Sequence, residues 1–266
     1  MKRLFVLFVF VGSLSSQGWG AAGFTTEFQA RVANDDEILN ALDKMGVDSN
    51  TCPLVSYRLY DNNDSVFQKN DISVRYRDKG KKSDLCVKIK LQYSEQLLKV
   101  LSVYFADETI KKEINRYYNF GKYAGESGQV ELTFKAQVKK KDLGLDVSDR
   151  LDDGQIMDLF YEVLKKIKNN YPEVESTDPI LNSIKYKMSL FMDGDLKLPL
   201  VVRSFNRCSW EIKDWNGYET VTAEYSNTQH SDPFLEISTR VEGNNDSNDF
   251  FDKLKEAGVF KEEKVQ

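Results

Sequence analysis

Basic side chains recur at every second position in several segments of this chain. Successive side chains of a β-strand point to opposite faces, so these residues share one face of each predicted strand. The cations placed in this way are Arg31, Arg58, Arg75, Arg77, Lys88, Lys90, Lys135, Lys185, Lys187, Arg203, Arg207, Lys213 and Arg240. The carboxylates on the same faces are Glu27, Glu131, Glu211, Glu224 and Glu236. Clustered guanidinium and ammonium groups bind phosphoryl and other anionic oxygens, and glutamates can hold Mg²⁺ or Mn²⁺.

The arrangement of the strands decides what these faces do. The whole chain is acidic, with a net charge of -5, so the basic excess is confined to the strands. In an open sheet the faces are solvated surface, and their charges keep strand edges from aggregating. In a closed barrel they line a basic channel. Alternation alone favours the open sheet, whereas a barrel with a wet lumen and helices outside also covers the apolar strand faces.

Other chemistries have little support in the composition. His230 is the only histidine and no C-x-x-C spacing occurs, so Ser–His–Asp and Cys–His mechanisms are excluded unless His230 carries one alone. Cys52, Cys86 and Cys208 permit one disulfide and one spare thiol but specify neither. Nucleic acid is not an expected partner, because no basic helix or aromatic platform is present.

The elements that position these residues are mostly strands. Helical spacing of apolar residues predicts helices over 35–45, 152–169 and 247–257. Alternation predicts strands over 24–32, 55–61, 71–77, 84–93, 130–138, 183–191, 200–207, 209–215, 218–225 and 234–241. Segment 94–123 has features of both, and its second half stays undecided. The pattern lacks strand–helix repeats and indicates an α+β fold with about eight antiparallel strands.

The first 22 residues have the pattern of a secretory signal. Lys2 and Arg3 precede a short apolar run over 4–11, and small residues follow it. Cleavage after Gly20 or Ala22 would leave small residues at the required positions. We therefore expect a periplasmic or secreted location, one domain over 23–266, and no membrane span after cleavage.

Four stretches resemble the CYTH, or triphosphate tunnel, family. They are the opening strand 27–31, the aromatic strand 57–61 that ends in Asp, the Arg-x-Arg strand 71–77 with its Lys-bearing neighbour 85–90, and the closing strand 234–238 with a following helix. The resemblance implies an eight-stranded antiparallel barrel with helices outside. It also implies that Arg75, Arg77, Lys88 and Lys90 contact phosphoryl oxygens.

The acidic residues depart from the family pattern. Where that family has Glu-x-Glu-x-Lys, this chain has Glu27, Gln29 and Arg31, and Ser238 follows Glu236 where a second acid is common. Glu27 and Glu236 are the remaining candidates for holding Mg²⁺ or Mn²⁺. The resemblance therefore supports anion binding more than hydrolysis.

The sequence leaves several functions open. The first is an exported barrel that binds a phosphorylated or polyanionic small molecule, or polyphosphate, with or without weak metal-dependent hydrolysis. The second is the same barrel without catalysis, and the third is a structural or protein-interaction module with Trp210, Trp215, Tyr218 and Tyr225 at its surface. The residues expected to bind the ligand are Arg31, Arg58, Arg75, Arg77, Lys88, Lys90, Lys135 and Arg203.

Overall fold

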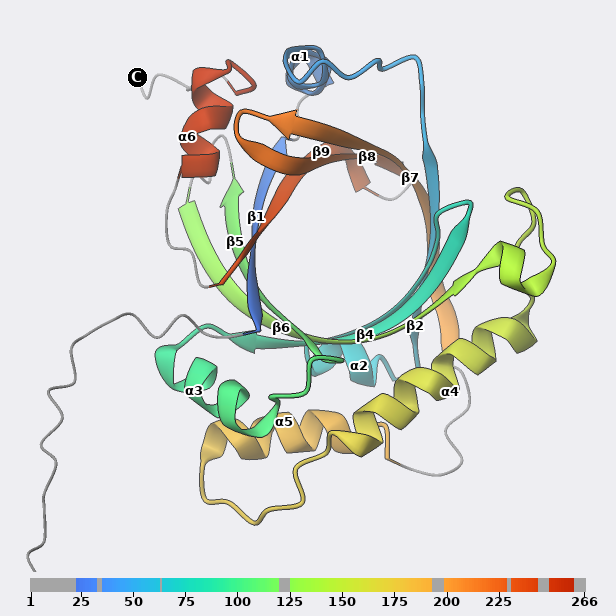
Figure 1. Ribbon diagram of the computed structural model, residues 1–266, viewed down its shortest axis with the longest axis vertical. Coiled ribbons are helices and arrows are strands. Elements are labelled where there is room, and N and C mark those ends of the chain that lie inside the picture. Colours follow the sequence, from blue (N-terminus) through green and yellow to red (C-terminus); the bar gives the residue numbers. More distant parts are fainter. Residues whose placement is uncertain are drawn as a thin grey trace, which may run out of the picture.

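The strands close into a single barrel (Figure 1). The computed structural model describes residues 23–32, 35–62, 64–119, 125–192, 199–228, 231–243 and 249–260. Within these ranges the strands are β1 (Phe24–Val32), β2 (Leu54–Asp61), β3 (Ile72–Asp78), β4 (Lys82–Gln92), β5 (Lys111–Asn119), β6 (Gly125–Lys139), β7 (Leu200–Trp215), β8 (Tyr218–Thr228) and β9 (Ser231–Glu242). Their order around the barrel is β1-β5-β6-β4-β3-β2-β7-β8-β9, and β9 pairs with β1. The predicted barrel is thus confirmed, with nine strands in the described residues in place of about eight.

One pair departs from the expected antiparallel pattern. β1 and β5 run parallel, with Glu27 opposite Asn115, whereas the other neighbouring strands are antiparallel. Strands joined by a hairpin must be antiparallel, but β1 and β5 are separated by three other strands in the sequence. The connection leaves either orientation possible, and alternation within a strand gives no information about its partner.

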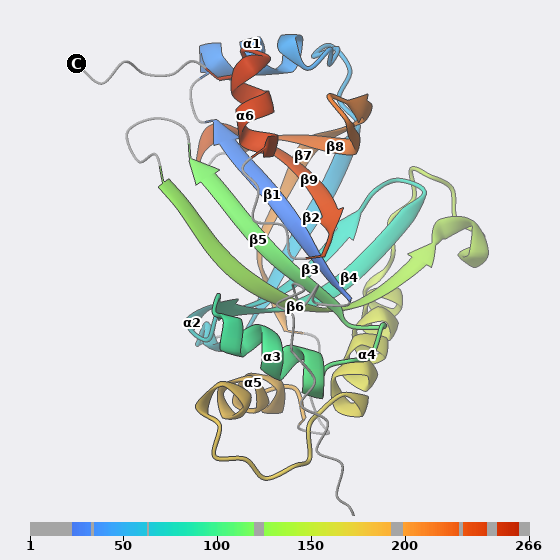
Figure 2. The same cartoon turned by 60° about the vertical axis from the view of Figure 1, so that its left-hand side comes forward.

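Helices cover the barrel on two sides (Figures 1 and 2). α3 (Glu95–Tyr104), α4 (Asp153–Asn169) and α5 (Pro179–Ser189) pack with the short α2 (Val66–Lys69) against the outer faces of β3 to β6. α1 (Asp35–Lys44) and α6 (Asp249–Glu256) cover β1, β8 and β9. A 3-10 turn, η1 (Lys140–Leu143), follows β6. Because apolar side chains fill both outer layers, the alternate side chains of the same strands face the lumen.

The strand predicted over 183–191 is wrong, because this segment belongs to α5. Asp178 caps the helix by accepting hydrogen bonds from the amides of Ile180 and Leu181, and Pro179 stands in the first turn. The buried residues Leu181, Ile184 and Met188 follow helical spacing. Lys185 and Lys187 therefore lie outside the barrel and not on a strand face.

The undecided segment 94–123 contains both kinds of element. α3 begins after Ser94, whose side chain accepts a hydrogen bond from the amide of Leu97, and β5 follows it. The two strands predicted over 200–207 and 209–215 are one long strand, β7. The remaining predicted helices and strands are present, with ends shifted by a few residues.

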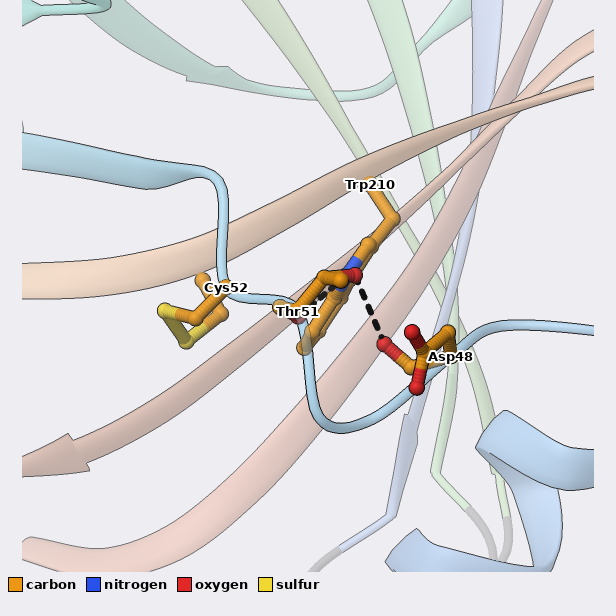
Figure 3. The surroundings of a disulfide bond; sticks show 5 residues. Asp48, Thr51, Cys52 and Trp210 are labelled. Carbon is orange, nitrogen blue, oxygen red and sulfur yellow. Dashed lines mark hydrogen bonds between the residues drawn. A yellow bond between two sulfur atoms is a disulfide. The ribbon is translucent and has the colours of Figure 1, made fainter.

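A disulfide joins Cys52 to Cys208 (Figure 3). Next to it, Trp210 on β7 donates a hydrogen bond from Nε1 to the carbonyl oxygen of Thr51 at 2.9 Å, and the Thr51 hydroxyl donates to the carbonyl of Asp48. The segment before β2 is therefore tied to β7 at several points. Cys86 is buried with a free thiol.

The predicted signal over 1–22 lies outside the described residues. Among the helices that are described, none is long and apolar enough to cross a membrane.

Candidate functional site

A cavity of about 420 Å³ opens into the lumen of the barrel. Its lining comes from strands around the barrel and includes Gln29, Arg31, Ser73, Arg75, Lys88, Lys90, Tyr117, Tyr118, Gln129, Glu131, Arg207 and Glu236. Five of these side chains are cationic and two are carboxylates, which leaves a surplus of three positive charges. Apolar residues adjacent to them in sequence, such as Val74, Val87 and Ile89, belong to the outer core. The polar faces predicted from alternation thus form the inner surface.

Three of the five cations have a carboxylate partner. Arg31 contacts Glu236 at 3.1 Å, and the Lys88 ammonium lies 2.5 Å from Glu131. Arg207 contacts Glu224 at 2.9 Å. Burial raises the pKa of Glu224, but Arg207 and the hydroxyl of Tyr57 outweigh it and hold that pKa below its usual value.

Arg75 and Lys90 differ from the other three. Among the described residues neither forms an ion pair, although both line the cavity. The Arg75 Nε is buried and has no hydrogen-bond partner. Its guanidinium carbon lies 5.7 Å from the centroid of the Tyr57 ring, and the charges of Asp84 and Glu224 act on it without a direct ion pair. Because Arg75 is partly buried and forms no direct ion pair among the described residues, its N–H groups remain available for an incoming anion.

Arg77 and Lys135 lie on the same inner surface but share a carboxylate. Arg77 forms a two-point contact with Asp84 at 2.9 and 3.1 Å, and Lys135 approaches the same carboxylate at 3.4 Å. Burial raises the pKa of Asp84, but Arg77 outweighs that effect and the net pKa is lowered. These two cations are therefore partly neutralised inside the barrel.

Aromatic rings hold several lumen arginines in place. Phe234 lies between Arg31 and Arg207, whose guanidinium carbons are 4.5 and 5.2 Å from its centroid. Tyr57 stacks on Phe205 with centroids 5.0 Å apart, and Arg203 lies over Phe205 from an exposed position. Guanidinium groups stacked on rings keep their edges available for hydrogen bonds. Burial, followed by the Glu224 charge, raises the pKa of Tyr57 to about 12, so its hydroxyl stays protonated.

Arg58 does not face the lumen, which corrects its assignment to the ligand-binding set. Its guanidinium contacts Asp153 of α4 at 3.5 Å and lies near the ring of Tyr76 in the outer core. In β2 it is Tyr57 that faces inward. An aromatic residue in an alternating strand resembles a residue of the apolar face, although its hydroxyl can interact with a charged interior.

Three buried acids occupy the adjacent strands β1, β5 and β6. Glu113 on β5 lies opposite Glu131 on β6, and Glu27 on β1 is close enough to Glu113 for the two charges to repel. Arg240 on β9 contacts Glu27 and also Glu113, the latter at 2.7 Å. Lys111 lies 2.6 Å from Glu113. Each acid therefore has a cation from the chain itself.

The two acids expected to hold a divalent ion are not together. Glu27 is paired in register with Arg240, and Glu236 with Arg31, four residues further along β1. Four residues of a strand span about 13 Å, far more than the distance between two ligands of one ion. Among the described residues no group of three His, Cys, Asp or Glu side chains is placed so that it could hold a metal ion. The donor set as arranged does not fit Mg²⁺ or Mn²⁺.

Several residues of the lumen were missed or left out of the candidate set. Glu113 and Lys111 lie in the segment whose structure was undecided. Arg207 and Arg240 were placed on polar strand faces, but only the closed barrel brings them to the cavity wall and to the acids. His230 lies outside the described residues.

Comparison with known proteins gives similarity of backbone shape only. No family model and no curated protein matches the sequence. A candidate adenylyl cyclase from Hippeastrum, described as having a dominant triphosphatase activity, is 10% identical with a TM-score of 0.48, over 88% of this chain and 87% of that one. A candidate adenylate cyclase from Bacillus halodurans is 12% identical with a TM-score of 0.44, over 91% and 96%. At such values these similarities carry no information about activity.

Proposed function

We propose that the protein binds a phosphorylated or otherwise polyanionic small molecule in the lumen of its barrel. The observation that carries this proposal is the pair of cavity-lining cations, Arg75 and Lys90, that form no ion pair within the part of the chain that the structure describes. A cavity of about 420 Å³ has room for a compact polyanion such as tripolyphosphate. The surplus of positive charge and the confined geometry both favour such a ligand over a neutral one.

The lumen residues would act by charge and geometry. The free guanidinium edge of Arg75 would donate to two anionic oxygens, and Lys90 would supply a point charge. Lys88 and Arg31 would then exchange part of their contact with Glu131 and Glu236 for contact with the ligand. Because the acids remain nearby, they limit the affinity for a monoanion and favour ligands with several charges.

Binding of inorganic tripolyphosphate, measured by isothermal titration calorimetry in the presence of EDTA, tests the proposal. The wild-type chain should bind it, and affinity should fall with added NaCl because charge dominates the interaction. Arg75→Ala and Lys90→Ala should each weaken binding by about tenfold or more, as expected for loss of a charge-assisted contact.

Two variants provide matched controls. Arg58→Ala removes the same charge from the outside of the barrel, and Lys99→Ala removes an exposed lysine from α3. Both should bind as the wild type does. If tripolyphosphate and related polyanions produce no heat and no thermal shift with the folded wild type, the proposal is wrong.

The protein-interaction alternative has no comparable support. Trp215 and Tyr218 pack edge-on against Phe250 of α6, and Trp210 and Tyr225 pack against the same core. These aromatic residues therefore hold α6 on the barrel, and nothing about them requires a partner protein.

We further propose that the protein is exported and acts in the periplasm or outside the cell. The charged and apolar pattern of residues 1–22 supports this location. The Cys52–Cys208 disulfide is a second, independent support, because such bonds persist mainly in oxidising compartments.

A further inference from the structure

Arg240 forms ion pairs with two buried carboxylates at once. Its guanidinium reaches from β9 across β1 and contacts two carboxylates, Glu27 and Glu113, on different strands. Both acids are almost completely buried, with 5% and 2% of their side chains exposed. Gln29 donates a further hydrogen bond to Glu27 at 2.8 Å, and Lys111 holds Glu113 from the other side.

We propose that Arg240 is a built-in counter-cation that takes the place of a divalent metal ion in this lumen. Two carboxylates on adjacent strands are the usual beginning of a site for a hard cation. Here the guanidinium spans them and supplies the positive charge that such an ion would bring. This inference extends the proposed function, because it makes polyanion binding independent of divalent metal.

The surroundings of the two acids support this role. Asn115, fully buried and opposite Glu27 in the β1–β5 register, has no hydrogen-bond partner on either side-chain polar atom. Its amide oxygen adds a third potential oxygen donor beside the two carboxylates. Removal of Arg240 would therefore leave a negatively charged group of oxygen atoms at the place that the Arg240 guanidinium occupies in the wild type.

Mn²⁺ binding in the absence of any phosphate tests the inference directly. Titration of the purified full chain, followed by the electron paramagnetic resonance signal of free Mn²⁺, should show no specific site in the wild type at submillimolar metal. Arg240→Ala should acquire one site, with at least a tenfold gain in affinity, and Glu27→Gln in the same chain should abolish it. Arg58→Ala is the control, since it removes an equal charge outside the lumen.

A measurement on the wild type keeps the test decisive if Arg240→Ala fails to fold. The dissociation constant for tripolyphosphate, measured in EDTA and in Mg²⁺ at matched concentrations of free tripolyphosphate, should differ by less than twofold. Wild-type Mn²⁺ binding that Glu27→Gln or Glu113→Gln removes would overturn the inference, and so would tripolyphosphate binding that requires Mg²⁺. A complete absence of tripolyphosphate binding would contradict the proposed function but leave the Mn²⁺ result to decide the role of Arg240.

Discussion

At the scale of single residues, two neighbouring glutamates, Glu27 and Glu113, have pKa values shifted in opposite directions. Burial, followed by the charge of Glu113, raises the pKa of Glu27. Burial also raises the pKa of Glu113, but Arg240 and Lys111 outweigh it and lower that pKa from 4.5 to about 2. The difference arises because Glu113 has two close cations, whereas Glu27 shares Arg240 with it.

Glutamine substitutions should therefore have unequal effects. Glu113→Gln removes a charge that stabilises the fold and should lower the free energy of unfolding at pH 7 by about 2–3 kcal/mol. Glu27→Gln removes a charge that burial and Glu113 disfavour, so it should lower that free energy by less than Glu113→Gln does, leave it unchanged or raise it. Urea denaturation at pH 7 measures both, and equal losses for the two variants would contradict this interpretation.

The dependence on pH follows from the direction of each shift. Because the pKa of Glu113 is lowered in the folded state, its contribution to the free energy of unfolding is present above pH 4.5 and is lost as the pH falls towards 2. The raised pKa of Glu27 acts in the opposite sense, because the contribution of Glu27 to the free energy of unfolding is present below pH 4.5 and is lost as the pH rises. The stability gap between wild type and Glu113→Gln should thus shrink in acid.

At the scale of elements, β7 connects most features of the site. It supplies Phe205 and Arg207 to the lumen, pairs with both β2 and β8, and carries Cys208. The disulfide fixes the start of β2 against the middle of β7, where Leu54 and Cys208 are paired. The Cys52–Cys208 disulfide therefore helps to fix the positions of Arg203 and Arg207, which lie close to Cys208 on β7.

Loss of the disulfide should destabilise the barrel without changing its lumen. The bond closes a loop with a sequence separation of 156 residues, for which chain entropy predicts about 5 kcal/mol. Cys52→Ser should lower the melting temperature by roughly 10 °C. Scanning calorimetry measures this change, and reduction of the wild type should reproduce it. Cys86→Ala is the control, because the Cys86 thiol is unpaired; a similar loss in both variants would exclude a special role of the disulfide.

At the scale of the whole molecule, an acidic chain encloses a basic interior. The net charge is -5, yet the cavity has five cations and two carboxylates. The closed sheet separates the two kinds of charge, with most acids on helices and loops outside. The cations of the cavity are therefore presented only to ligands that enter the lumen.

Export makes a prediction about the whole chain. When it is expressed with its first 22 residues in a bacterium that secretes through the general pathway, the mature protein should begin at Ala21 or Gly23. N-terminal sequencing and intact mass identify the cleavage point, and mass after alkylation without reductant should show one reactive thiol in the denatured chain. Recovery of the uncleaved chain in the cytoplasm with three reactive thiols would contradict export.

The sequence by itself determined most elements and the faces of their side chains. Alternation in β3 and β4 placed Arg75, Lys88 and Lys90 on polar faces correctly, because a strand has the same two-residue period in any sheet. The prediction from alternation failed in α5, where a helix cap and the helical spacing of the buried residues outweigh a short alternating pattern. It also failed for Arg58, because an inward Tyr57 resembles a core residue.

Only the tertiary structure decided which charges meet. The contacts of Arg240 with Glu27 and Glu113 join residues from three strands, two of them parallel and far apart in the sequence. Pairing across a closed barrel depends on strand order and register, which alternation within one strand does not encode. The sequence alone therefore predicted most of the charged residues on the inner strand faces. Which of their cations lack an ion pair, and which of their acids have one, depends on how the barrel closes.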